Sequence, residues 1–305
     1  MAFAISVVMS TAAAAYPDRG CDRSEVHVRM LRLFASPAYR PPVLPAIALE
    51  MVQLSQRPHI TFDEVAALLE RDPVLAAKVL SIAQSALYAP RCPVLSLKQA
   101  SVRLGMKALR SLVVEAALKL RVFSAPGYDA TMERLARHST ASAHLMRMLC
   151  RETQIDAEYA FLCGLLHDVG IAACLLALAD DVRGGVVPFE ALRSVLDLVH
   201  EDASGLVTRL WGLPAEIQRI AATHHQLEVG GTPHPVNAAL IVAEQLASEL
   251  DAGMSCAEER GLDANSPELF AAACRSLHLD EDRLKAARAE AVKIVEAISC
   301  PTRDN

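Results

Sequence analysis

The stretch FLCGLLHDVG, residues 161–170, places His167 directly beside Asp168 at the end of an apolar run. Neutral imidazole and carboxylate groups are ligands of divalent metals such as Zn, Fe, Mn and Mg. A carboxylate at the carboxyl end of a helix faces the negative pole of the helix dipole, so we expect a cation to compensate the charge of Asp168. The doublet is therefore a candidate metal-binding element, with plain helix termination as the alternative interpretation.

Histidines are concentrated around this doublet. The chain has 10 histidines, and the following lie between residues 138 and 225: His138, His144, His167, His200, His224 and His225. In a helical bundle, ligands converge on a metal when each projects inward from a different helix. Each residue also has a simpler interpretation, because a single histidine in a helix is commonly hydrogen-bonded or solvated. The spacing predicts candidates for a metal site and leaves both interpretations open.

Helix signals run along nearly the whole chain. In ITFDEVAALLERD, Thr61 and Glu64 have the spacing of a capping box, and Asp72 before Pro73 starts the next helix. Apolar residues recur at helical spacing, without strand alternation of useful length and without a repeat of fixed period. An apolar content of 52% with only 4% aromatics is typical of Ala- and Leu-rich helical packing. We expect an all-α helical bundle.

Two loops divide the chain. SAPGYD at 124–129 and DDVRGGVVP at 180–188 carry Pro and Gly between periodic segments. The segment from residue 266 to residue 299 predicts two amphipathic helices. The expected organisation has four parts: a partly disordered extension at 1–39, an N-terminal helical half at 40–123, a second helical half at 124–250, and closing helices at 251–305.

The charge and cysteine content restrict the partners and the compartment. The formal net charge is −6, which argues against a large nucleic-acid-binding surface but allows a small anionic ligand. The 8 cysteines include no CxxC pair, so we expect reduced thiols and a cytoplasmic protein. The apolar N-terminal stretch lacks the basic start of a secretory signal, and we expect no membrane-spanning helix because charges interrupt every long apolar run.

Several motifs, taken in order, resemble the HDOD domain, the HD-related output domain of bacterial signalling proteins. The resemblance covers the chain from about residue 40 to about residue 250. It rests on these motifs: Leu44-Pro45, Asp72-Pro73, QSALY at 84–88, LG…LR at 104–110, HS at 138–139, FLCGLLHDVG at 161–170, WGLP at 211–214 and HH at 224–225. The resemblance implies an all-helical fold whose second half is related to HD-type metal-dependent phosphohydrolases.

The resemblance also implies a set of metal ligands. HD enzymes hold a divalent metal with a His, the His-Asp doublet and a later Asp. Those positions match His138, the doublet His167-Asp168, and Glu244 in IVAEQLA, where Glu replaces the Asp. Related HD-GYP phosphodiesterases, which cleave cyclic di-GMP, add further histidine ligands. Three residues stand where those are expected: His200, His224 and His225.

The chain departs from the hydrolases just after the doublet. Such enzymes follow it with Gly and Lys, whereas here Gly170 is followed by Ile171. A Lys beside the metals can neutralise charge on a phosphoryl oxygen, and the loss of such a donor costs about 10²–10³ in rate. The change at Glu244 is milder, because one added methylene displaces the carboxylate by about 1.5 Å. The Gly-Tyr-Pro signature of the HD-GYP enzymes does not follow the doublet.

These observations predict a bacterial signalling module rather than an efficient enzyme. The resemblance implies action through signalling partner proteins or a small ligand such as a nucleotide, with a metal-capable site that is inactive or weakly active. The alternative is a metal-dependent phosphohydrolase acting on a nucleotide or cyclic dinucleotide, in which metal-bound hydroxide attacks phosphorus and a histidine protonates the leaving group. A nucleic-acid-binding regulator is disfavoured by the acidic balance.

Overall fold

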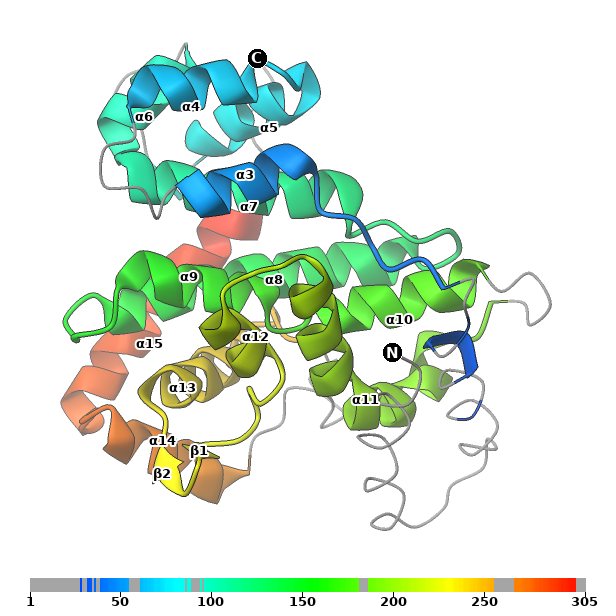
Figure 1. The fold of residues 1–305 in the computed structure, drawn as a ribbon. Helices are drawn as coiled ribbons and strands as arrows, with labels where there is room; N and C mark the ends of the chain where they lie inside the picture. Colours follow the sequence, from blue (N-terminus) through cyan, green and yellow to red (C-terminus); the bar gives the residue numbers. More distant parts are fainter. Residues whose placement is uncertain are drawn as a thin grey trace.

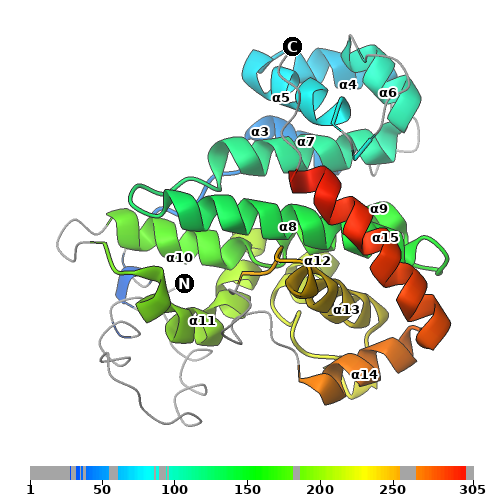
Figure 2. The same cartoon turned by 180° about the vertical axis from the view of Figure 1, so that it is seen from behind.

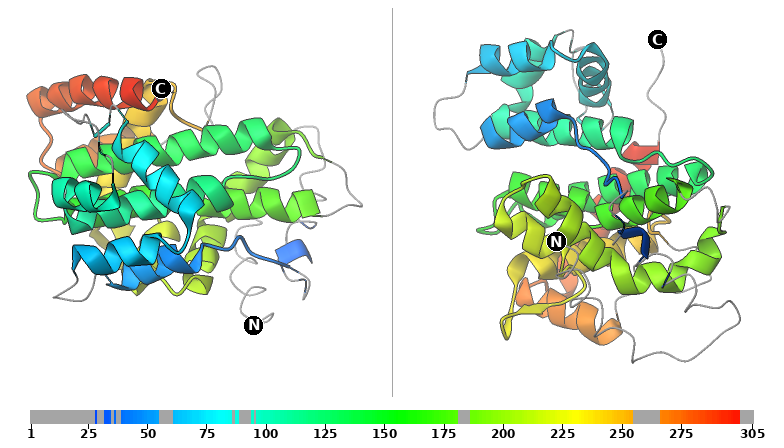
Figure 3. Two further views of the ribbon diagram at one scale, coloured as in Figure 1. Left: turned by 90° about the horizontal axis from the view of Figure 1, so that it is seen from above. Right: turned by 45° about the vertical axis from the view of Figure 1, so that its right-hand side comes forward.

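The chain folds into helices almost throughout, which confirms the predicted all-α class (Figure 1). The computed structural model describes residues 28, 32–34, 36, 39–54, 61–85, 87–88, 94, 96–180, 186–254 and 266–299. Two helical layers lie one above the other, and the views in Figure 3 show the N-terminal helices stacked on the helices of the second half. Apart from the short helical segment 32–34, the predicted extension at 1–39 lies mostly outside the described residues.

The upper layer is formed by short helices whose starts follow the cap residues in the sequence. These are α3 (Ala46–Leu54), α4 (Phe62–Leu69), α5 (Pro73–Ala83), α6 (Leu97–Leu104) and α7 (Met106–Arg121). The capping box between Thr61 and Glu64 forms as predicted. Asp72 accepts hydrogen bonds from two backbone N–H groups at the start of α5. Local polar side chains therefore set where these helices begin, because they satisfy N–H groups that the helix leaves unpaired.

The second half contains the longer helices. These are α8 (Asp129–Cys150), α9 (Ala157–Leu166), α10 (Val169–Asp180), α11 (Phe189–Leu210), α12 (Ala215–Ala221) and α13 (Pro235–Glu249), followed by the closing helices α14 (Pro267–Ser276) and α15 (Glu281–Ser299). As Figure 2 shows, α15 runs along this half and ends where α7 and α8 lie close together. The two closing helices agree with the amphipathic pattern of the sequence.

One small antiparallel hairpin was not predicted. Strands β1 (Glu228–Val229) and β2 (Thr232–Pro233) pair across Gly230 and Gly231. Both glycines have positive φ, +65° and +80°, a region that residues with a Cβ adopt at a cost. Each strand is only two residues long, too short to produce a visible alternation of polar and apolar residues.

The surroundings of Asp168 differ from the prediction. α9 ends at Leu166, and α10 begins at Val169, with the Ile171 N–H donating to the carbonyl oxygen of Asp168. The carboxylate therefore lies at the start of a new helix as well as at the end of the previous one. Because the positive pole of α10 is adjacent, the dipole argument for an unfavourable position was wrong.

A buried polar network joins the two layers. The Arg147 guanidinium on α8 donates to Glu158 Oε2 at 2.8 Å and stacks 3.9 Å from the ring centre of Phe161. Ser111 on α7 donates to the same oxygen of Glu158 at 2.6 Å. A charged hydrogen bond between partly buried side chains is costly to break, because the remaining charge is left unpaired. The upper layer is thus fixed to the helices that carry the candidate site.

The most apolar segment belongs to the core. Ala157–Asp180 is long and apolar enough to cross a membrane by length and composition alone, but 94% of its apolar window is buried inside the fold. The turn at 167–168 also divides it into two helices. The segment therefore has the properties of a core element. Four cysteines in the described residues are buried and free: Cys150, Cys163, Cys174 and Cys274.

Candidate metal centre

Seven side chains that the sequence singled out converge between the helices of the second half. They come from α8, the turn between α9 and α10, α11, the segment after α12, and α13: His138, His167, Asp168, His200, His224, His225 and Glu244. All are buried except His225, whose side chain is 24% exposed. His225 therefore lies where the centre comes closest to solvent.

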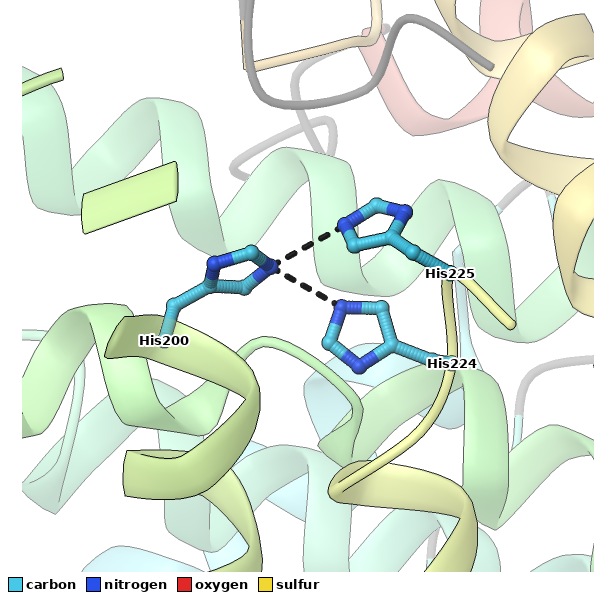
Figure 4. A group of neighbouring side chains, drawn as sticks. All are labelled: His200, His224 and His225. Carbon is cyan, nitrogen blue, oxygen red and sulfur yellow. Dashed lines mark hydrogen bonds between the residues drawn. The ribbon is translucent and has the colours of Figure 1, made fainter. Parts of the chain in front are cut away.

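Two groups of ligand atoms form within this cluster. His138 and His167 approach each other with their Nε2 atoms 3.2 Å apart, and Asp168 Oδ2 lies 3.5 Å and 3.3 Å from those two nitrogens. The second group is shown in Figure 4, where His200 Nε2 lies 3.1 Å from His224 Nε2 and 3.0 Å from His225 Nε2. Within each group the ligand atoms lie within 4.8 Å of one another, close enough to hold one metal ion.

The carboxylate of Asp168 connects the two groups. Its Oδ2 faces the first group, while Oδ1 lies 3.3 Å from His224 Nε2 and 3.7 Å from His200 Nε2. Glu244 has a similar position, with Oε1 3.3 Å from His167 Nε2 and Oε2 3.6 Å from His225 Nδ1. The added methylene of Glu244 thus leaves its carboxylate in contact with histidines of both groups.

The backbone fixes the protonation of four imidazoles. Each Nδ1 lies 2.7–3.0 Å from a carbonyl oxygen: His138 from Ala252, His167 from Gly164, His200 from Leu196 and His224 from Ala221. A carbonyl oxygen only accepts, so each Nδ1 carries the proton, and a neutral ring then presents the lone pair of Nε2 to the cluster. Holding a ligating histidine by its other nitrogen is typical of metal sites.

This arrangement needs a positive charge at its centre. Two neutral imidazoles whose Nε2 lone pairs face each other, as in the pairs His138–His167 and His200–His224 at 3.1–3.2 Å, repel unless a proton or a metal ion lies between them. Asp168 Oδ1 is buried and, within the described structure, has no hydrogen-bond partner of normal geometry. Nitrogen-rich groups with carboxylates suit a borderline divalent ion. The residues therefore fit a metal ion in each group.

The charges in the cluster polarise one another. Burial alone lowers the pKa of His167, but Asp168 and Glu244 outweigh it and raise that pKa well above its usual value. Burial raises the pKa of Asp168, yet His167 and the other histidines hold it well below its usual range. The same competition lowers the pKa of Glu244 to about 2. Both carboxylates are therefore ionised at neutral pH, ready to balance a cation.

The histidines of the second group respond differently. Burial lowers the pKa of His225 to about 3 and also lowers the pKa of His200. Burial likewise opposes protonation of His224, but Asp168 outweighs it and raises that pKa. Neutral imidazole is the form that coordinates a metal. Two of these three ligands are therefore in the binding form at neutral pH.

The position that holds Lys in the hydrolases is apolar and enclosed here. Ile171 is fully buried and belongs to the hydrophobic core. Within the described part of the chain, no Lys or Arg is among the principal charges that shift the pKa values of His167, Asp168, Glu244 and the three histidines of the second group. His144 lies apart from the centre, against Phe161 and 3.4 Å from Arg147. The sequence thus identified the cluster, and His144 is excluded from it.

Comparison with known proteins identifies the family. The sequence model of the HDOD domain matches residues 41–227, more than half of the chain. The chain belongs to the HDOD family. This confirms the resemblance read from the motifs. The matched range of the HDOD chain includes six of the seven clustered residues, and Glu244 lies beyond it.

Solved structures share this HDOD fold. An HDOD domain protein of unknown function from Geobacter sulfurreducens is 24% identical, with a TM-score of 0.66 over 90% of this chain and 98% of that one. A protein of Shewanella amazonensis SB2B described as "Putative metal-dependent phosphohydrolase" is 17% identical, with a TM-score of 0.68 over 91% and 99%. At these identities the likeness shows the fold alone.

Two further relatives add context. A protein of Marinobacter aquaeolei VT8 described as "Putative signal transduction protein" is 23% identical, with a TM-score of 0.62 over 98% of this chain and 67% of that one. An uncharacterized protein of Treponema pallidum (strain Nichols) is 24% identical over 67% of this chain. The match spans only 42% of that relative's length.

Asn237, which the sequence analysis did not select, holds the His224-His225 pair in place. Its buried Nδ2 donates to the carbonyl oxygens of Thr223 and Gln226, both at 2.7 Å, on either side of the pair. It lies on α13, seven residues before Glu244, and therefore on the same face of the helix. The sequence feature that could have identified Asn237 is a polar residue within an apolar helix. The sequence alone does not show which carbonyl groups accept its hydrogen bonds.

We expect Asn237→Asp to destabilise this HDOD protein by about 3 kcal/mol, because a buried carboxylate would face two carbonyl oxygens and lose both hydrogen bonds. Urea denaturation at neutral pH measures the change in the free energy of unfolding. The matched control is Gln53→Glu, the same chemical change at an exposed position of α3, which should cost less than about 0.5 kcal/mol. Equal effects of the two variants would show that Asn237 has no special role.

Proposed function

We propose that this HDOD protein is a signalling module that binds divalent metal in the second half and acts through partner proteins or a small ligand rather than by rapid turnover. One observation carries the proposal: two buried groups of metal ligands share Asp168, yet the adjoining position that would supply a cation holds the buried Ile171. The centre has the ligands that bind metal and lacks a donor that phosphoryl transfer uses.

The metal ions would be held by the two groups described above. His138 and His167 with Asp168 Oδ2 would take one ion, and the three other histidines with Asp168 Oδ1 would take the second. A divalent ion at such a site supplies Lewis acidity and lowers the pKa of bound water. Imidazole-rich groups favour Fe or Zn, whereas the carboxylates Asp168 and Glu244 also suit Mn or Mg.

The surroundings of the centre favour a regulatory role. Six of the seven residues are buried. His225 is the most solvent-exposed of them. A phosphodiester substrate needs room beside the metal and donors for the developing charge. The sequence has no CxxC pair, and this cysteine pattern supports our inference that the protein works in the cytoplasm.

The second candidate is a metal-dependent phosphohydrolase acting on a nucleotide or cyclic dinucleotide. The completeness of the ligand set favours it, since every position that the hydrolase resemblance requires has a residue able to bind metal. In this function, Asp168 and the histidines would hold the metal, which would lower the pKa of bound water and so supply the nucleophile. The Shewanella amazonensis structure described above has the same fold.

Metal analysis combined with a hydrolysis assay separates the two candidates. We expect the purified protein to bind up to two metal ions per chain and to show no turnover of cyclic di-GMP or bis(p-nitrophenyl) phosphate above the Asp168→Ala variant. Measurable turnover that disappears in that variant would establish the phosphohydrolase instead. Protein that binds none of Fe, Mn or Zn would contradict both candidates.

We expect metal affinity to rise as the pH increases above about 6.5. In the metal-free protein, the pKa values of His167 and His224 are raised above 6.5, so both rings hold protons that a metal ion must displace. The stabilising contribution of these protons is fully present below pH 6.5 and is lost as pH rises through the folded pKa values. The metal ion therefore displaces the protons on His167 and His224 more easily at higher pH.

Isothermal titration calorimetry with Zn²⁺ or Mn²⁺ measures this competition directly. Titrations at pH 7 in two buffers of different ionisation enthalpy should give different binding enthalpies, because protons released from the histidines pass to the buffer. Identical enthalpies in both buffers would show that neither ring is protonated before metal binds.

A further inference from the structure

A cavity separate from the metal centre lies between the two layers of the fold. Its volume is about 560 Å³, within the usual range for small-molecule sites. Residues from α5, α7, α8 and the end of α15 line it, among them Lys78, Lys119, Phe123 and Arg137. Figure 2 shows α15 ending beside α7 and α8. The cavity thus includes residues of the upper layer, the second half and the closing helix.

Three cations from three different helices line this cavity. Lys119 is 26% exposed and forms an ion pair with Glu115 at 2.7 Å. Lys78 and Arg137, by contrast, form no ion pair or hydrogen bond with another described side chain, and Arg137 Nε is buried without a partner. Even Glu133, one helical turn before Arg137, does not pair with it. A partly buried guanidinium without an acceptor favours an anion from outside the chain.

The charges are arranged by depth. Lys78, Lys119 and Arg137 are partly buried, whereas the carboxylates Asp129 and Glu133 are exposed at the rim. Exposed charges are screened by water, so the deeper cations dominate the field inside the cavity. Carboxylates at the rim repel a long polyanion but accept hydrogen bonds from hydroxyl groups. The polar hydroxyl of Thr140 and the apolar ring of Phe123 complete the lining.

We propose that this cavity binds a small phosphate ester that carries sugar hydroxyls, of the kind found in a mononucleotide. The phosphate is held by Arg137 and Lys78, and the hydroxyls face Asp129 and Glu133. Arg137 directly precedes His138 on α8, and its side chain faces the cavity while His138 faces the metal centre. Binding therefore acts on the same helix that positions one ligand of the metal.

The test uses AMP as the probe and inorganic phosphate as a comparison. Calorimetric titration of the metal-free full chain should show AMP binding that weakens at least tenfold in Arg137→Gln and in Lys78→Gln. The matched control is Arg151→Gln at the residue that caps the end of α8, where the side chain is exposed and pairs with Glu290 outside the cavity. This variant should bind AMP as the unaltered protein does.

Several outcomes would overturn the assignment. The first is that AMP does not bind. The second is that inorganic phosphate binds as tightly as AMP. The third is that Arg151→Gln weakens AMP binding as much as Arg137→Gln does. The Asp168→Ala variant separates this cavity from the metal centre, because AMP binding there should be unchanged; its loss would place the nucleotide at the metal centre instead. Circular dichroism of each variant checks that the protein is folded. Because Lys78 is partly exposed, Lys78→Gln should change the stability of the fold only slightly.

Discussion

Replacing Asp168 by Asn is expected to remove bound metal from both groups of ligands. The amide keeps the size of the side chain but loses the negative charge, and one end of it carries N–H groups that repel a cation. Because Oδ2 faces His167 and Oδ1 faces His224, a single change affects both groups. Loss of a residue that only hydrogen-bonds to a metal ligand lowers metal affinity by roughly 10–100-fold. Loss of a charged ligand at each site should lower it by more.

Metal content after desalting, measured by mass spectrometry, tests this expectation. The unaltered protein should retain up to two ions per chain and Asp168→Asn close to none. Glu249→Gln is the matched control, since Glu249 is a partly exposed carboxylate on α13 paired with Arg288 at 2.9 Å, away from the centre. If Asp168→Asn loses half of the metal, the carboxylate serves one group only. In that case the bridging geometry is wrong.

The helix starts could be predicted because their causes are local. The Thr61 box and the Asp72 cap depend on residues within one turn, so the sequence contains the donor, the acceptor and their spacing. The surroundings of Asp168 were misjudged for the opposite reason. Whether a new helix begins at Val169 depends on packing against α11 as well as on the local sequence, and that packing is not visible in a short motif.

The composition of the candidate centre could be predicted, but its chemistry could not. The motifs identified every clustered side chain, from His138 to Glu244. The acceptors that fix the imidazoles are backbone carbonyl groups, such as Gly164 and Ala252, which leave no trace in residue type. The same holds for Asn237, whose two acceptors are also carbonyl groups. Contacts made by the backbone across helices require the structure.

The same distinction applies to the cavity between the layers. Lys78, Lys119 and Arg137 are ordinary surface residue types and lie far apart along the chain. They face a common space because α5, α7 and α8 pack at the junction of the two layers. The hydrogen bond from Ser111 on α7 to Glu158 on α9 also joins the two layers. The cavity connects the proposed ligand to α8, the helix that carries His138.

Gly170→Ala is expected to destabilise the protein by about 2–4 kcal/mol and to disturb the second ligand group. At Gly170 the start of α10 packs directly on α11, and the Gly170 N–H donates to Ser204 Oγ at 2.9 Å. A Cβ here would lie 2.7 Å from Ser204 Oγ and closer still to His200 O and Ser204 N. Backbone atoms cannot rotate away, so the helices must separate.

The steric cost should outweigh the gain in helix propensity, which favours Ala over Gly by about 1 kcal/mol. Urea denaturation measures the net loss, and Ser204→Ala is the control that removes the hydrogen bond without adding volume, at about 1 kcal/mol. Because the carbonyl oxygen of His200 is one of the atoms displaced, Gly170→Ala should also weaken metal binding, whereas Ser204→Ala should not. A Gly170→Ala protein as stable as the original would mean that α10 and α11 do not approach this closely. The position of His200, and with it the second ligand group, would then need revision.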